Sequence, residues 1–407
     1  MRTPWSQRIR MNVSAHNRIA CVFLLACVTA WSAPMISIGP HIAIHMEAEV
    51  EAKYLSNITM SVHNDQARDD TILTFTPGLE LALFENSPHF ELLFGAERDF
   101  VHFLDMGQFN DEPWALRFRT GYTGDLFSLK FNWDTRESLQ NISSAAQTQT
   151  PFHFKYDDDI VVNDVDNLGL NFHIAFSPKT GLRSGFSMND TAYGYASGKP
   201  DALLDYETLA VPLDLFYEIT PKLESILGYR YRRVSFANVA GYRDHYVNFG
   251  LIGDITAKSD LQVVLGYQNR NRPKQPDTKT QHTFAANLNW KYMATERLHF
   301  NLGGSRDFGV GSGEGESIEL SSAHAGLDLL FTESMILESG VQLMHSKYSS
   351  GRKDLGGNAG TTFNVRPRNS SWEFQGGYRY DWNEFKASGT TYDYKNHNVI
   401  LGTSWRY

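Results

Sequence analysis

The sequence predicts an all-β chain that closes into an antiparallel transmembrane barrel of about 16–18 strands. Three observations predict this fold. Apolar and polar residues alternate with a period of two from residue 41 onward. Tight turns alternate with long polar connections along the chain. Aromatic residues make up 13% of the sequence, yet no stretch after the N-terminal segment approaches the roughly 18 consecutive apolar residues of a membrane helix.

The alternation is clearest in the last strand. One face carries Val399, Leu401, Thr403, Trp405 and Tyr407, and the opposite face carries Ile400, Gly402, Ser404 and Arg406. Segments 223–232 and 284–292 repeat the pattern. Successive side chains of a strand point to opposite faces, so we expect one apolar face toward lipid and one polar face toward water.

The connections distinguish a barrel from a soluble sandwich, which would also alternate. Short turns such as 123–125, 220–222 and 332–334 are followed by longer connections such as 138–165 and 269–281. Short turns on one rim and long loops on the other are typical of a transmembrane barrel. Segment 353–365 is the weakest expected strand, so both 16 and 18 strands stay open.

The first 30 residues predict a cleavable export signal. Arg8, Arg10 and Arg18 form a basic region, and an uncharged apolar core follows at 19–30. Cleavage is expected after Ala30, or alternatively after Ala33, and Met11 offers a second start. A membrane anchor needs a longer core, and the lipoprotein-like sequence ending at Cys27 is a weaker alternative. The expected organisation is a signal peptide at 1–30, a short periplasmic segment at 31–40 and the barrel at 41–407.

The net charge and the cysteine content restrict the classes of partner that the chain is expected to bind. Both cysteines, Cys21 and Cys27, lie within the signal, which fits export but discriminates weakly. Removal of residues 1–30 takes away four Arg, leaving 33 Lys and Arg against 46 Asp and Glu, a net charge of about −13. This acidic balance excludes nucleic acid as an expected partner.

Charged residues on the polar face of the strands are expected in the lumen. The expected solute-contacting basic patch is Arg117, Arg119, Lys130 and Arg136. Further basic residues expected in the lumen are Arg230, Arg232, Lys291 and Arg379. The acidic set is Glu47, Glu49, Glu51, Glu97 and Asp99. Guanidinium groups bind carboxylates in a fork, and opposed charges orient dipolar solutes. The alternative is that these charges pair locally, as in any wet lumen. Phe216 is the exception to an expected scarcity of large inward aromatics.

No catalytic motif or cofactor site is evident, and the chain is not expected to be an enzyme. The sequence has no Gly-x-Ser-x-Gly and no phosphate loop. Asp157, Asp158 and Asp159 in the long acidic loop 138–165 could take Ca²⁺, but a solvated acidic loop is the commoner case.

The terminal strand also predicts partners. Its apolar positions Val399, Leu401 and Trp405, with the final Tyr407, resemble the signal that the barrel-assembly machinery reads. The expected partners are therefore this machinery, outer-membrane lipid and lipopolysaccharide, and a polar solute or polysaccharide in the lumen.

Two stretches carry a family resemblance. They are Asn57–Thr59 with Asp69–Leu81, and Ile219–Leu223 with Leu227–Val234. Together they resemble a family of β-barrel porins often encoded with exopolysaccharide synthesis and export genes, over about residues 45–407. The long acidic loop and the weak strand depart from its pattern. The resemblance implies an outer-membrane channel for polysaccharide and brings no catalytic residues. A porin-like channel for a polar or anionic solute is the leading hypothesis. A structural or adhesive surface barrel is the alternative, followed by an outer-membrane barrel enzyme.

Overall fold

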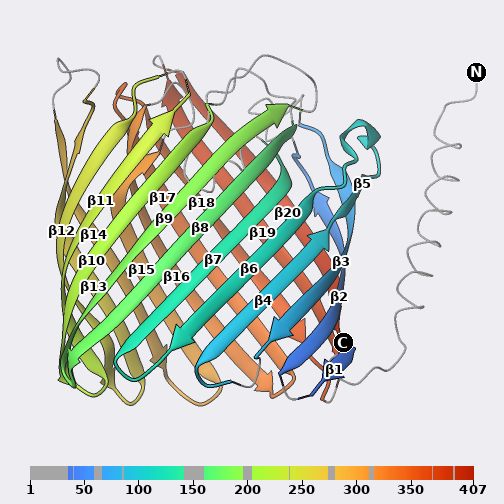
Figure 1. The fold of residues 1–407 in the computed structure, drawn as a ribbon. Coiled ribbons are helices and arrows are strands. Elements are labelled where there is room, and N and C mark those ends of the chain that lie inside the picture. Colours follow the sequence, from blue (N-terminus) through green and yellow to red (C-terminus); the bar gives the residue numbers. More distant parts are fainter. Residues whose placement is uncertain are drawn as a thin grey trace, which may run out of the picture.

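A computed structural model describes residues 35–39, 41–58, 67–84, 87–141, 160–195, 204–237, 239–273, 280–310, 316–368, 370–387 and 390–407. They form one antiparallel sheet of strongly tilted strands (Figure 1). The strands are β1 (Ile36–Ile38), β2 (Ile42–Leu55), β3 (Asp70–Leu83), β4 (Phe90–Arg98), β5 (Phe100–Phe103), β6 (Trp114–Thr123), β7 (Phe127–Asn141), β8 (Ile160–Ser177), β9 (Thr180–Tyr195), β10 (Tyr206–Thr220), β11 (Leu223–Phe236), β12 (Tyr242–Thr256), β13 (Ser259–Asn271), β14 (Gln281–Met293), β15 (Leu298–Val310), β16 (Ser317–Thr332), β17 (Met335–Tyr348), β18 (Lys353–Val365), β19 (Trp372–Ala387) and β20 (Thr390–Arg406). A short 3-10 turn, η1 (Gly107–Phe109), follows β5.

The sheet closes on itself between its first and last long strands. β2 pairs with β20 from Glu47 opposite Arg406 to Leu55 opposite Asn398. β4 and β5 both pair with β3 and share one place in the wall, and β1 only extends the start of β2. The barrel therefore has 18 strands, which resolves the choice between 16 and 18. Segment 353–365, expected to be the weakest, is β18 and is fully paired on both sides.

The apolar face of the strands points outward. Leu227, Val247, Phe249 and Tyr267 on three adjacent strands are 55–57% exposed, although large apolar side chains usually avoid water. Closure leaves no unpaired strand edge, which hydrocarbon would penalise by several kcal/mol for each unsatisfied group. An apolar exterior on a closed sheet is the structure of a barrel that spans a bilayer. No helix in the described part of the chain is long and apolar enough to cross a membrane.

Three of the short turns at one rim of the barrel share a local design (Figure 1). A hydroxyl in the last residue of a strand accepts a backbone N–H from within the turn, as Thr220 Oγ1 does from Lys222, Thr256 Oγ1 from Lys258 and Thr332 Oγ1 from Ser334. A register shift stands beside each of these three turns. Serine and threonine favour turns through such side-chain bonds. The sequence therefore encodes two-residue turns at these three positions.

Several strands run further than the sequence indicated. β7 and β8 pair from Phe127 opposite Ile174 up to Asn141 opposite Ile160, so both ends of the expected loop 138–165 are strand. The expectation was wrong there because strands above a membrane need no apolar face, and their backbone ladder tolerates polar side chains on both faces. Asp157, Asp158 and Asp159 lie outside the described residues, as does the expected signal at 1–30, and both remain predictions.

Candidate functional site

The predicted basic patch lies on the inner wall, but nearby carboxylates neutralise most of its charge. Arg117 Nη2 lies 2.5 Å from Glu97 Oε1 and 3.6 Å from Glu47 Oε2. Lys130 Nζ lies 3.8 Å from a carboxylate oxygen of Glu91, and Arg136 Nη2 lies 3.6 Å from Asp99. Local pairing, the alternative reading of these charges, thus accounts for three members of the patch.

Arg119 is the exception in this patch. It faces the lumen on β6 between Leu93 of β4 and Asn132 of β7, and it makes no ion pair with any described residue. The acids Glu49 and Glu51 of β2 likewise face the lumen without an ion pair among the described residues. Free charge of each sign therefore remains on this side of the wall.

Two glycines let Arg117 lie flat against the wall. A Cβ on Gly95 would stand 3.0 Å from Arg117 Nε, and a Cβ on Gly78 would stand 3.0 Å from Glu97 Cγ. Arg406 joins the same cluster, with Nη2 2.6 Å from Glu80 Oε1. The guanidinium of Arg117 consequently spans several strands to reach carboxylates on β2 and β4.

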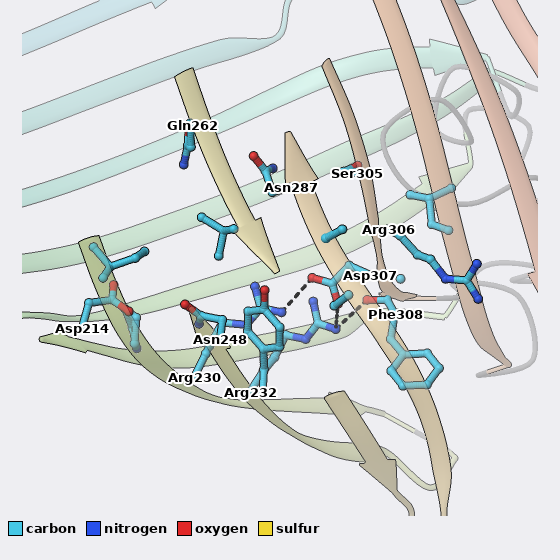
Figure 2. Close-up of a pocket in the computed structure, with 18 of the residues that line it drawn as sticks. Asp214, Arg230, Arg232, Asn248, Gln262, Asn287, Ser305, Arg306, Asp307 and Phe308 are labelled. Carbon is cyan, nitrogen blue, oxygen red and sulfur yellow. Dashed lines mark hydrogen bonds and ion pairs between the residues drawn. The ribbon is translucent and has the colours of Figure 1, made fainter. Parts of the chain in front are cut away.

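A second charged region surrounds a recess in the wall. The recess has a volume of about 520 Å³ and lies over β10 to β15 (Figure 2). Its polar lining includes Asp214, Arg230, Arg232, Tyr246, Asn248 and Asp307. Volumes of this order suit a small solute. This recess is the candidate functional site.

Ion pairs fix two arginines in the recess. Arg230 Nη2 lies 2.7 Å from Asp307 Oδ2. Arg232 Nη2 lies 2.6 Å from Asp244 Oδ2 and donates to the carbonyl oxygen of Phe308 at 2.5 Å. The Arg230 guanidinium also lies over the Tyr246 ring, 4.9 Å from its centroid, an arrangement that stabilises the cation. Figure 2 shows both arginines reaching from β11 toward the end of β15.

Behind the recess, Arg270 ties the ends of two further strands to the wall. Its Nη1 donates to Gly309 O at 2.7 Å and to Ser317 Oγ at 3.1 Å, at the end of β15 and the start of β16. Tyr242 Oη donates to Glu316 O at 2.7 Å. The Arg270 guanidinium also lies 4.7 Å from the Phe308 ring centroid. These contacts hold the β15 and β16 ends against β12 and β13.

One side of the recess carries two acceptors, the Asp214 carboxylate and Asn248 Oδ1, that have no hydrogen-bond partner among the described residues. Asp214, Gly228 and Asn248 stand opposite one another on β10, β11 and β12. A Cβ on Gly228 would collide with Asp214 Oδ1 and would lie 2.7 Å from Asn248 Oδ1. The absence of a side chain at Gly228 therefore lets Asp214 and Asn248 converge (Figure 2).

Sequence reasoning found Arg230 and Arg232 but missed their partners. Arg270 and Asp307 were assigned to the long connections 269–281 and 307–316, and inward aromatics such as Tyr242 and Tyr246 were not expected. The alternation Tyr242, Asp244, Tyr246, Asn248 was the available signal. Because those residues are polar or amphipathic, no apolar period marked the strand end.

The other predicted residues are also placed on the expected faces. Lys291 stands opposite Asp260 and Asn301 on the inner face, and Arg379 Nε lies 3.0 Å from Asp381 Oδ1. Val399 and Leu401 are exposed on the outer face of β20. The described residues contain no group of three or more His, Cys, Asp or Glu that could hold a metal ion. Contact of the lumen residues with a solute remains a prediction.

Comparisons with known proteins give only a likeness of structure. No family model matches the chain, and no curated protein matches its sequence. OpdO of Pseudomonas aeruginosa aligns at a TM-score of 0.49 and 12% identity, over 90% of this chain and 97% of that one. OpdK of the same organism, crystallised with vanillate, gives 0.49 and 11% over 89% and 99%. OccAB2 of Acinetobacter baumannii gives 0.49 and 8% over 90% and 98%. Values this low assign no solute and no residue role.

The barrel itself defines the class. The sheet is closed, antiparallel and 18-stranded, with an apolar exterior, a charged interior and short turns at one rim. These features define an outer-membrane β-barrel. The chain is an integral protein of the outer membrane.

Proposed function

We propose that this barrel is an outer-membrane channel for small polar solutes, anionic ones included. The observation that carries the proposal is the contrast between the two faces of the wall. The outer face is apolar, whereas the inner face carries arginines, lysines and carboxylates from β2 around to β20. A barrel of about 18 strands encloses space for water, unlike one of eight strands.

The charge arrangement supports selective passage. Glu49 and Glu51 on β2 and Arg119 on β6, which make no ion pair with a described residue, face the same water, as do the recess charges on β10 to β15. Opposed charges in a water-filled passage set up a transverse field that orients dipolar or charged solutes. Side-chain amides such as Asn248, Gln262 and Asn287 supply hydrogen bonds between these charges.

A planar-bilayer recording tests the channel. The purified mature barrel should insert and give stable, stepwise ion current at both voltage polarities. A well-folded barrel that inserts and stays electrically silent would overturn the proposal and would favour the adhesive surface barrel instead. Folding is checked independently by the shift in gel mobility between heated and unheated samples.

Polysaccharide passage, implied by the family resemblance, has no specific support in the described residues, and we do not carry it forward. The apolar exterior supports contact with outer-membrane lipid and lipopolysaccharide. The terminal strand supports recognition by the barrel-assembly machinery. Both partners remain part of the proposal.

A further inference from the structure

We infer that the recess over β10 to β15 binds small zwitterionic solutes of the α-amino-acid type. This inference rests on the proposed channel function and names the solute class of one site in it. It follows from three features of the recess: its charge balance, its unengaged acceptors on one side, and a partly free guanidinium nearby.

The charges in and behind the recess balance. Three guanidinium groups, Arg230, Arg232 and Arg270, stand against three carboxylates, Asp214, Asp244 and Asp307. Arg306, which also lines the recess, is paired with Glu319 and leaves the balance unchanged. A solute with a net negative charge gains little binding free energy here, because Asp244 and Asp307 already pair with the guanidinium groups. A solute with no net charge but separated charges keeps the balance and satisfies both ends.

The acceptor side requires a donor. Asn248 is 7% exposed, and its buried Oδ1 has no hydrogen-bond partner among the described residues. Asp214 beside it makes no hydrogen bond or ion pair there either. Buried acceptors without donors are costly, so a ligand that supplies donors gains free energy. An ammonium group, with three N–H donors and a positive charge, suits a carboxylate and a carbonyl that converge over Gly228.

The hydrogen-bond donor for the other end of the solute is Arg230, the next residue of β11 on the same face as Gly228. Arg230 is two residues from Gly228 on β11, a separation of about 6.6 Å along a strand. Its side chain is 28% exposed, and only Nη2 is engaged, by Asp307. Nη1 makes no hydrogen bond within the described residues. An α-amino acid can bridge this span with its ammonium at Asp214 and its carboxylate at Arg230.

Alanine and two probes that each lack one of its charged groups separate the alternatives. Alanine carries both charges, propionate carries only the carboxylate, and ethylammonium carries only the ammonium. Each is added to the wild-type channel in a bilayer, and the concentration that halves the ion current is measured. Alanine should act at a concentration about tenfold lower than either partial probe, since it makes one more charged contact than each of them.

Two variants locate the effect at the recess. Asp214→Asn should weaken block by alanine about tenfold, as expected for one charge-assisted contact. Gly228→Ala should do the same without changing any charge, because the new methyl group separates Asp214 from Asn248. Asp328→Asn, which removes a lumen carboxylate from β16 outside the recess, is the matched control and should leave block by alanine unchanged.

The outcomes are distinguishable. Equal potency of alanine and propionate in a conducting channel would overturn the zwitterion site and leave the channel function standing. So would an unchanged alanine response in both Asp214→Asn and Gly228→Ala. A wild-type barrel that conducts no ions would instead overturn the proposed function on which the site rests.

Discussion

Asp244 and Arg270 stand directly opposite each other on β12 and β13 and form a two-pronged ion pair that water hardly reaches. Arg270 Nε lies 2.7 Å from Asp244 Oδ1, and Arg270 Nη2 lies 2.8 Å from Oδ2. Each side chain is 1% exposed. Arg232 donates to the same carboxylate, so Asp244 holds two guanidinium groups in place. The stability of the wall around the recess therefore depends on one aspartate.

Asp244→Asn should destabilise the barrel strongly. The change leaves the buried guanidinium of Arg270 facing a neutral amide, while Arg232 keeps its 3.4 Å ion pair with Asp307. Breaking a buried pair in this way costs about 3–5 kcal/mol. The free energy of unfolding is measured by urea titration of the barrel refolded in lipid vesicles. Arg368→Gln is the control, because its pair with Glu333 is 75% and 79% exposed and should contribute about 1 kcal/mol or less. Equal losses in the two variants would contradict the role given to Asp244.

Arg270→Lys should make the open channel noisier while keeping the charge. The guanidinium fork binds Asp244 with two nitrogens and reaches Gly309 O with the third, whereas a lysine ammonium cannot hold both at once. The ends of β15 and β16 should then move against the wall. Single-channel recordings should show larger current fluctuations than wild type. Arg379→Lys, at the more exposed pair with Asp381, should not change the noise, and a quiet Arg270→Lys channel would refute the tether.

Arg119→Glu should shift ion selectivity toward cations. Arg119 is the member of the predicted basic patch that makes no ion pair with a described residue, so its field is not cancelled locally. Reversal potentials in a salt gradient measure the permeability ratio. Arg98→Glu on the outer face is the control, since Arg98 pairs with Glu112 and faces away from the lumen. An unchanged reversal potential in Arg119→Glu would leave the patch without a role in selectivity.

The fold was readable from the sequence wherever a strand crosses the membrane, because lipid on one face and water on the other impose the period of two. Val399 and Leu401 against Gly402 and Ser404 show that signal, and the turn at Thr220 marks where it ends. Above the membrane both faces meet water, so the ends of β7, β13 and β15 carry no such period.

The candidate site was predictable only in part for the same reason. Arg230 lies in the periodic part of β11, whereas Asp307 and Arg270 lie in strand ends that resemble loops. The ion pairing of Arg117 could not be predicted from the sequence for another reason. Its partner Glu47 is three places away around the wall, on β2, and the contact depends on barrel curvature and on the space left by Gly78 and Gly95. Alternation assigns a residue to a face but does not choose its partner.

Tyr407→Ser should reduce assembly in cells without weakening the finished barrel. Closure uses the backbone of Tyr407, whose N–H donates to Met46 O at 2.8 Å and whose carbonyl accepts from Met46 N at 2.7 Å. Among the described residues, the ring of Tyr407 stacks on Trp405, with ring centroids 5.9 Å apart. The amount of heat-modifiable barrel in outer membranes should therefore fall several-fold, while protein refolded from urea keeps wild-type stability. Phe331→Ser removes an exposed aromatic next to a turn in β16 and is the control for simple loss of the aromatic girdle. If both variants reduce assembly equally, the terminal residue is one more girdle aromatic and carries no separate signal.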